Sequence, residues 1–405
     1  MSARPRCRIT SPSDSLQDLA NPAGSDRRQG ECGRACCLGK HQSRAGRHGL
    51  AYSRQPQRST AATTSTNNPN PMKGLYEKLR SIGLRTPYVR RYLLPEWWDD
   101  EAAASPAGFT EAVWTIARHL GVEPAQLRDP TEPVRLPTGT RVQYKLSGDA
   151  QPESVALARQ LGEQVAKFVM LGAASPSGPR PADARAIRTA ILEKGASWVG
   201  FGNLLDYCWH LGIPVLHVSE LPSGTTKKMD GMAVPIGDRS AIVLTSGRRN
   251  PAWMLFLLAH ELGHICSGHL ADGSTFVDAD IDAASTDPKE REANDFALAL
   301  ITGNAATRIV PKARWPNAAD LAVGAQSLGR QISVDPGHIV LNYAHSMPGN
   351  FWGVANAALK LIPSEGDPAA MIRDRMSANL DWSNLPSEAA EFVARMTGQD
   401  GSAQP

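Results

Sequence analysis

The chain has 405 residues, 41% of them hydrophobic, which is enough to form a sizeable core in about two or three domains. The formal net charge of +3 provides no overall field that would direct the protein to nucleic acid or to acidic substrates. There is no run of 18 or more apolar residues and no apolar segment behind the N-terminal arginines, so we expect a cytoplasmic protein without a membrane span or a secretory signal.

Residues 1–71 differ in composition from the rest of the chain. They are rich in Arg, Ser, Gly, Asn, Pro and Thr, and they carry 11 Lys and Arg against 4 Asp and Glu. Such a segment cannot bury enough apolar surface to order itself, so we predict disorder, with Met72 as an alternative start of an over-extended reading frame. Four of the six cysteines lie here, in a spacing that matches neither a disulfide framework nor a zinc pattern.

Residues 72–150 are predicted to form a helical, helix-turn-helix-like domain. A helix from Phe109, a turn at Gly121 and a second helix from about Glu123 produce this pattern. One interpretation is direct DNA binding, and the other is a small helical bundle used for docking. The second helix has few basic or amide side chains that could reach base edges, which favours docking.

The next part of the chain predicts helices followed by a small sheet. The expected helices are 153–171, 182–194 and 203–211, and the expected strands are 213–218, 231–236 and 241–245. Residues 133–147 are interpreted as a strand or a linker. A three-stranded sheet of this kind, with an edge strand able to pair with an extended peptide, suits a peptidase.

The stretch 251–269 carries the clearest chemical signal. It contains His260-Glu261-Leu262-Gly263-His264 within an apolar helix that Asn250 and Pro251 are well suited to start. Residues four apart share a helix face, so both imidazoles can bind one metal ion while Glu261 reaches a water molecule beside it. This is the zincin pattern of two histidine ligands and a glutamate that acts as general base.

A third metal ligand is sought in the helix that follows, at 287–301. At about 100° per residue, Glu290 falls on the same face as Ala293 and Ala297, whereas Glu292 falls on the opposite face. A buried carboxylate needs a positive partner, which favours Glu290 as the ligand. The alternative role for Glu290 is a capping box with the start of its own helix. The remaining competitors for the ligand position are Glu292, Asp278, Asp280, Asp282 and His269.

Together these stretches resemble the ImmA/IrrE metallo-endopeptidases. The resemblance rests on Ala259-His-Glu-Leu-Gly-His and Glu290-Arg-Glu-Ala-Asn-Asp-Phe-Ala, with Asp230-Gly231 and Arg249 upstream, and it covers about residues 200–303. It implies a zinc-dependent endopeptidase that cleaves a DNA-binding repressor protein, relieving repression of a mobile element or a stress regulon. It also places the third ligand three residues before an alanine, at Glu290. The run from Leu300 to Gly303 departs from the usual family sequence, beyond the ligands.

The expected fold class is α+β, mainly helical, with a zincin-like zinc metallopeptidase domain at 151–303 and a helical C-terminal appendage at 304–405. Candidate helices of the appendage are 318–330, 336–345, 351–361 and 386–396. Within the appendage, His338 and His345 are interpreted as ordinary helix residues.

The predicted site therefore consists of Glu261 as catalytic base and His260, His264 and Glu290 as ligands of Zn²⁺. Asn294 or one of the loop aspartates is expected to orient the imidazoles. His269 is a weak candidate for stabilising an oxyanion. The alternative function is a helix-turn-helix transcriptional regulator with a structural or sensory zinc site, but a purely structural site has no need of Glu261 beside the ion.

Overall fold

The computed structural model describes most of the chain from Pro71 onward. The described residues are 71–137, 142–145, 152–176, 181, 183–223, 229–271, 273, 275–278, 287–310, 316–347 and 351–399. The disorder predicted for the N-terminal segment concerns residues that lie outside this description. The domain boundaries proposed from the sequence stay predictions.

A small mixed sheet forms the centre of the fold. Its strands are β1 (Val142–Lys145), β2 (Val215–His217), β3 (Gly231–Ile236), β4 (Arg239–Leu244) and β5 (Thr275–Asp278), in the spatial order β1-β5-β3-β4-β2. Strand β3 is antiparallel to both of its neighbours, whereas the two outer pairs, β1 with β5 and β2 with β4, are parallel. Gly237, at φ 63°, makes the turn of the β3–β4 hairpin.

The sheet confirms the α+β fold class and corrects the predicted number of strands. Strands β2, β3 and β4 are the three expected from the sequence. Strand β1 lies within 133–147, where the sequence left a strand or a linker open, and β5 is additional. Strand β5 was not predicted because its acidic continuation suggested a surface loop. It pairs with the first half of β3, so β3 is an interior strand and the sheet's edges are β1 and β2.

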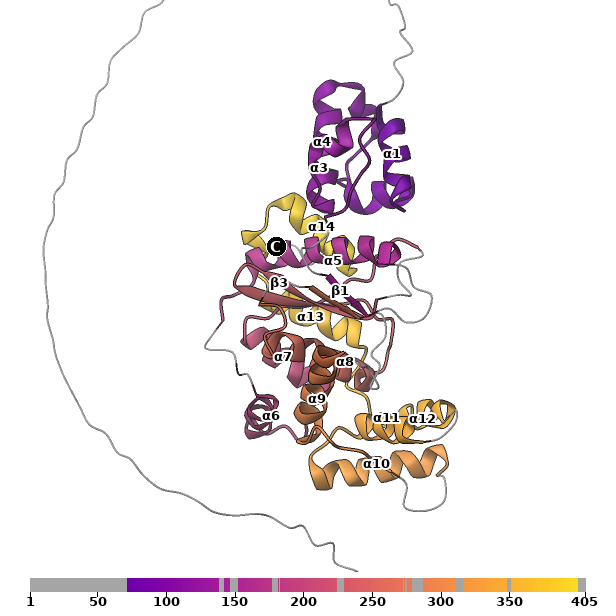
Figure 1. Ribbon diagram of the computed structural model, residues 1–405, viewed down its shortest axis with the longest axis vertical. Helices are drawn as coiled ribbons and strands as arrows, with labels where there is room; N and C mark the ends of the chain where they lie inside the picture. Colours follow the sequence, from indigo (N-terminus) through magenta and orange to yellow (C-terminus); the bar gives the residue numbers. More distant parts are fainter. Residues whose placement is uncertain are drawn as a thin grey trace, which may run out of the picture. The chain divides into compact units, whose positions relative to one another are not determined.

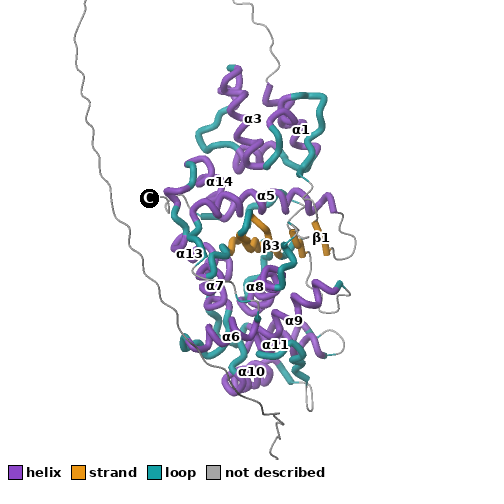
Figure 2. The backbone as a smooth tube through the Cα atoms, turned by 60° about the vertical axis from the view of Figure 1, so that its left-hand side comes forward, coloured by secondary structure: helices purple, strands orange, loops and turns teal. Residues whose placement is uncertain are grey.

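Helices cover both faces of the sheet (Figures 1 and 2). Helix α5 (Pro152–Gly172) packs on one face, and helix α8 (Pro251–Cys266) packs on the other. The approach of α5 is close: a Cβ on Gly162 would lie 2.4 Å from the Met232 side chain of β3 and 3.3 Å from Val243 of β4. Helix α8 is apolar on nearly every side because it is enclosed between the sheet and further helices.

The remaining described helices surround this core. They are α1 (Pro71–Ser81), α2 (Thr86–Tyr88), η1 (Val89–Leu93), η2 (Asp100–Ala104), α3 (Pro106–Leu120), α4 (Pro124–Arg128), α6 (Ala184–Glu193), α7 (Phe201–His210), α9 (Pro288–Thr302), α10 (Ala318–Ile332), α11 (Pro336–Ser346), α12 (Trp352–Leu359), α13 (Pro368–Asn379), η3 (Trp382–Asn384) and α14 (Ser387–Thr397). Helix α13 was not expected from the sequence. None of the described helices has the length and apolar character that crossing a membrane requires.

The N-terminal helices include the pair that suggested a helix-turn-helix. Helix α3 ends at Gly121, which has φ 62°, as the sequence predicts. Helix α4 is only five residues long, and its Leu127 is buried. Helix α3 packs through His119, which is stacked on Phe392 of α14 at a ring distance of 4.2 Å. The short second helix gives no added support to DNA contact, which stays a prediction.

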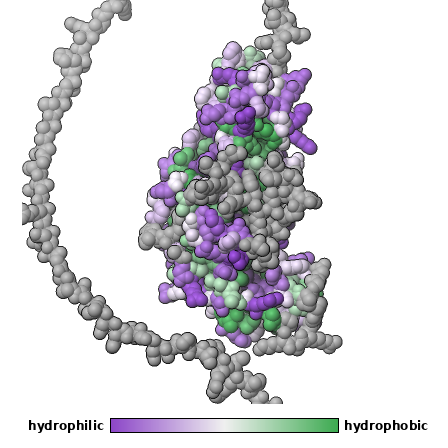
Figure 3. Space-filling view, in the orientation of Figure 1, coloured by the Kyte–Doolittle hydropathy of each residue, from purple (hydrophilic) through white to green (hydrophobic). Residues whose placement is uncertain are grey.

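Figure 3 shows one face of the molecule. Hydrophilic residues predominate over its described part, and hydrophobic residues are scattered among them in small groups. This distribution is ordinary for a protein surface and does not by itself indicate a functional site.

Candidate metal centre

Helix α8 carries the motif and is held firmly at both ends. The Asn250 side chain accepts a hydrogen bond from the Ala252 N–H, and Pro251 is the first helical residue. After the helix ends, Gly268 adopts φ 73°, a conformation that glycine takes without strain. His260 and His264 are both fully buried on this helix, one turn apart.

Three buried acceptor groups converge on one point. The Nε2 atoms of His260 and His264 are 3.1 Å apart. A Glu290 carboxylate oxygen lies 3.5 Å from the first Nε2, and the other oxygen lies 3.4 Å from the second. These three residues form the group within the described chain that can hold a metal ion, with ligand atoms all within 4.8 Å of one another.

The outer nitrogens of the two imidazoles indicate which ring nitrogen carries the proton. His260 Nδ1 lies 3.0 Å from the Asn294 side-chain oxygen, which can only accept, so Nδ1 donates. His264 Nδ1 lies 2.9 Å from His269 Nδ1, and His269 Nε2 lies 3.2 Å from a carboxylate oxygen of Glu292. The carboxylate accepts from His269 Nε2, so His269 Nδ1 accepts from His264. In this neutral arrangement both inner Nε2 atoms present lone pairs to the Glu290 carboxylate, which a cation would stabilise.

The third ligand position depends on how closely helices α8 and α9 approach. A Cβ on Gly263 would lie 3.1 Å from both Cα and the carbonyl oxygen of Ala293 and 3.3 Å from Cβ of Phe296. The glycine in the motif therefore allows α9 to lie directly against α8. Glu290 is 4% exposed, and the side chain that caps α9 is Asp287, which accepts from the Lys289 N–H. The geometry thus favours the ligand role of Glu290 over the capping role.

Glu261 lies beside this group, on the same helix and fully buried. A Cβ on Gly231, the first residue of β3, would lie 2.6 Å from Glu261 Oε1. The absence of a side chain at this position therefore gives the carboxylate its space. Strand β3 is an interior strand, so it is not itself the expected edge strand for an extended substrate.

The other residues considered as ligands are elsewhere or play a different part. The side chain of Glu292 is 61% exposed and contacts His269, not the convergent group. His269 itself supports His264 from outside, so an oxyanion role for it has no geometric basis here. Asp278 ends β5, and its side chain is not among those described; Asp280 and Asp282 lie outside the described residues.

A cavity of about 420 Å³ adjoins the convergent group. It is enclosed by α8, α9, α11, α12 and the segment 305–308. Asn294, which orients His260, is one of its lining residues, and so is Asp230, next to Gly231. The sequence interpretation did not anticipate that His338 and His345 line this cavity, because helical periodicity alone does not reveal which element a distant helix faces.

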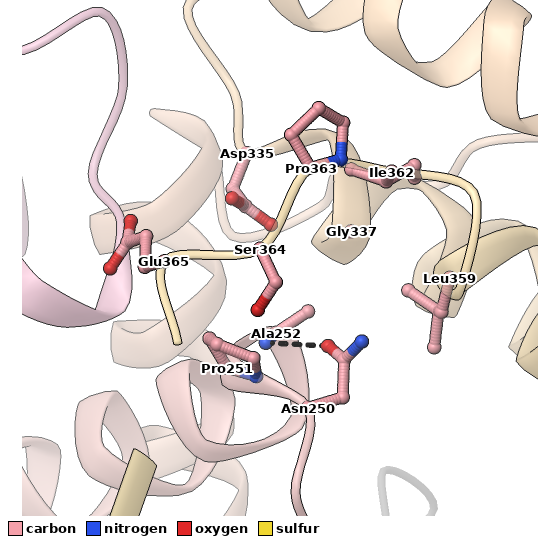
Figure 4. A pocket seen from close by; sticks show the side chains of 10 residues that line it. All are labelled: Asn250, Pro251, Ala252, Asp335, Gly337, Leu359, Ile362, Pro363, Ser364 and Glu365. Carbon is pink, nitrogen blue, oxygen red and sulfur yellow. Dashed lines mark hydrogen bonds between the residues drawn. The ribbon is translucent and has the colours of Figure 1, made fainter. Parts of the chain in front are cut away.

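A second, much smaller cavity lies between the starts of α8 and α11 (Figure 4). Its volume is about 30 Å³, room for little more than one water molecule. Asp335 lies at its edge, and burial raises the pKa of this carboxyl group to about 6. This volume is too small for a substrate side chain, so we assign the cavity a packing role.

Comparison with known proteins bears on the segment that contains this centre. Residues 210–326 match the family model of the IrrE N-terminal-like domain, Peptidase_M78. The match confirms the resemblance drawn from the motifs and supports a metallopeptidase of the ImmA/IrrE family. The matched domain begins at the end of α7 and ends within α10, so it contains α8 and α9 but not α11 or α12. No curated protein and no solved structure matches the chain.

Proposed function

We propose that the chain is a zinc-dependent endopeptidase of the ImmA/IrrE type that cleaves a DNA-binding repressor protein and thereby relieves transcriptional repression. The observation that carries the proposal is the convergence of His260 Nε2, His264 Nε2 and the Glu290 carboxylate, all buried, with Glu261 beside them. A site that served only to hold the fold together would not require Glu261 as a second buried acid next to the ligands.

The spacing of the donor atoms agrees with zinc. Ligand atoms about 2.0–2.1 Å from a tetrahedral ion lie roughly 3.3 Å from one another. The two Nε2 atoms are 3.1 Å apart, and each lies 3.4–3.5 Å from a different oxygen of the Glu290 carboxylate. Two imidazoles and one carboxylate are also a ligand set of catalytic zinc sites, which keep a fourth position for water or substrate.

The chain's own residues divide the work of peptide hydrolysis. When bound, zinc polarises the scissile carbonyl and lowers the pKa of a water molecule. Glu261 accepts the proton of the attacking water on its carboxylate and then delivers it to the nitrogen of the leaving amine. Asn294 and His269 hold the two imidazoles in the tautomer that keeps Nε2 free of a proton, so both Nε2 lone pairs would be available to a bound metal ion.

The substrate class in this proposal comes from the family that residues 210–326 match, and it is tested with purified components. The full chain, loaded with zinc, is incubated with the repressor encoded beside it, and the products are identified by mass spectrometry. We expect one discrete cut that a chelator prevents, that added zinc restores, and that Glu261→Gln abolishes. An intact repressor in the presence of zinc-loaded protein would refute the proposal. Sequence-specific DNA binding without any cut would instead support the regulator alternative.

A further inference from the structure

The cavity beside the metal centre is mainly apolar and large enough for a bulky side chain. Its volume of about 420 Å³ lies within the usual range of ligand pockets. Six large aromatic and aliphatic side chains line it, beside polar and charged residues: Trp253, Phe256, Leu257, Leu298, Leu341 and Trp352. Two of them, Trp253 and Trp352, have ring centroids 5.3 Å apart, so their faces and edges offer an environment suited to a further aromatic ring.

His338 places a polar group in this apolar wall. Its side chain is 3% exposed and stacked on Phe256 at a ring distance of 6.0 Å. Neither ring nitrogen has a hydrogen-bond partner among the described residues. A buried polar group in this condition costs free energy, which a ligand with a matching group can recover.

The chemistry of a neutral imidazole narrows the choice of that ligand. One ring nitrogen donates and the other accepts, so a group that can both donate and accept matches whichever of the two faces the cavity. A phenol hydroxyl can, whereas an ammonium or guanidinium group only donates and a carboxylate only accepts. Among amino-acid side chains, tyrosine alone joins such a hydroxyl to a large aromatic ring that fits the apolar wall.

Helix α8 sets the distance between the cavity and the metal ligands. Phe256, which lines the cavity, precedes His260 by one turn, which corresponds to a rise of about 6 Å along the helix. An extended peptide advances about 3.3 Å per residue, so this rise corresponds to about two residues of substrate. The shared residue Asn294, which lines the cavity and contacts His260, confirms that the two places adjoin.

We propose that this cavity binds a tyrosine side chain of the substrate protein, within about two residues of the bond that is cut, and that His338 recognises its hydroxyl group. The inference rests on the proposed peptidase function, and it specifies the substrate of the same site. It gives the helices beyond the matched domain a role, because α11 supplies His338 and α12 supplies Trp352.

Binding of small amides tests the proposal without any need for cleavage. The full-length, zinc-loaded Glu261→Gln protein is titrated with N-acetyl-tyrosinamide, N-acetyl-phenylalaninamide and N-acetyl-leucinamide, and the dissociation constants are measured by ligand-observed NMR. We expect the tyrosine amide to bind about tenfold more tightly than the phenylalanine amide, and the leucine amide to bind most weakly. Adding His338→Leu to the Glu261→Gln protein should remove the preference for the tyrosine amide over the phenylalanine amide, while the phenylalanine amide still binds.

Two further variants keep the test decisive. His210→Leu makes the same replacement at an exposed histidine that does not line the cavity and should preserve the preference for tyrosine. Ala306→Trp, at an exposed position of the cavity wall, should fill the space and weaken all three amides without requiring the core to repack. Equal affinity for tyrosine and phenylalanine amides, or no binding of either, would overturn the inference.

The outcomes separate this inference from the proposed function. If the tyrosine amide binds as expected but the repressor stays intact, the peptidase proposal fails while the cavity keeps its assignment as a tyrosine site. If the repressor is cut at a bond with no tyrosine within two residues on either side, the peptidase proposal stands and the tyrosine inference is overturned.

Discussion

Replacing His269 by alanine should weaken zinc binding although His269 is not a ligand. His269 is 6% exposed, and its Nδ1 accepts the hydrogen bond that fixes the tautomer of His264. Groups that hydrogen-bond to the outer N–H of a metal-binding imidazole typically contribute 10- to 100-fold to metal affinity. His264 is fully buried, so its Nδ1–H would lose its partner in a place that bulk water does not reach. We therefore expect His269→Ala to lower the zinc affinity near the upper end of this range, by about 30- to 100-fold, which is equivalent to about 2–3 kcal/mol.

The effect should decline along the chain of hydrogen bonds. Glu292 reaches zinc only through His269, and its side chain is 61% exposed, so water can take its place. We expect Glu292→Ala to weaken zinc binding by less than about tenfold, because an exposed hydrogen-bond partner is the easier one to replace. Glu290→Ala should abolish stoichiometric binding, because this carboxylate lies 3.4–3.5 Å from both ligand nitrogens.

The measurement is a competition titration of zinc against a chromophoric chelator at fixed pH, together with the zinc content of the dialysed protein. His345→Ala serves as the matched control, since it removes an exposed imidazole that is not among the metal-binding group. Melting curves of the zinc-free proteins exclude a general loss of structure. If folded His269→Ala bound zinc with wild-type affinity, the argument that His269 supports zinc binding by orienting His264 would be refuted. A loss of zinc in Glu292→Ala with retention in Glu290→Ala would overturn the choice of ligand.

Three further predictions concern catalysis, packing and pH. Glu261→Gln should retain zinc and lower the cleavage rate by at least about 10²-fold, because the proton acceptor is removed and the ligands are not; an unchanged rate would contradict its role as base. Gly263→Ala should destabilise the fold by about 1–3 kcal/mol in urea titrations, since the added methyl group would lie 3.1 Å from the backbone of Ala293. Burial lowers the pKa of His119 to about 4, so the unfolded chain binds the proton more readily than the folded chain does. The stability that His119 contributes is therefore present above about pH 6.5 and is lost as the pH falls toward 4. The free energy of unfolding should therefore fall by about 3 kcal/mol less between pH 7 and pH 4 in His119→Gln than in the wild type, and parallel curves would contradict this.

The ligand helices could be predicted because their signals are local. The i, i+4 spacing of His260 and His264 and the position of Glu290 on the apolar face of its helix depend only on helical periodicity. Strands β2, β3 and β4 and helices α5 to α8 follow from the same kind of pattern, within two or three residues at their ends. Asn294 could be named as an orienting residue because it shares a helix with Glu290.

The features that were missed depend on pairing between distant segments. Strand β5 is stabilised by hydrogen bonds to β1 and β3, and its acidic continuation concealed this in the sequence. The relay from His264 through His269 to Glu292 crosses from the end of α8 to α9, and no spacing rule connects those positions. The cavity wall at His338 is formed by a helix more than seventy residues beyond the motif.

Helix α11 packs closely on α8, the helix that carries two of the convergent residues. A Cβ on Gly337 would lie 2.6 Å from the Cβ of Ala252, so only glycine allows α11 to start where it does, directly beside the start of α8 (Figure 4). His338 is the residue after Gly337, and its ring stacks on Phe256. Phe256 in turn lies one helical turn before His260. The position of the cavity wall is thus fixed against the same helix that carries the ligands. A segment outside the matched domain can therefore select the substrate while the centre that would cut it stays within that domain.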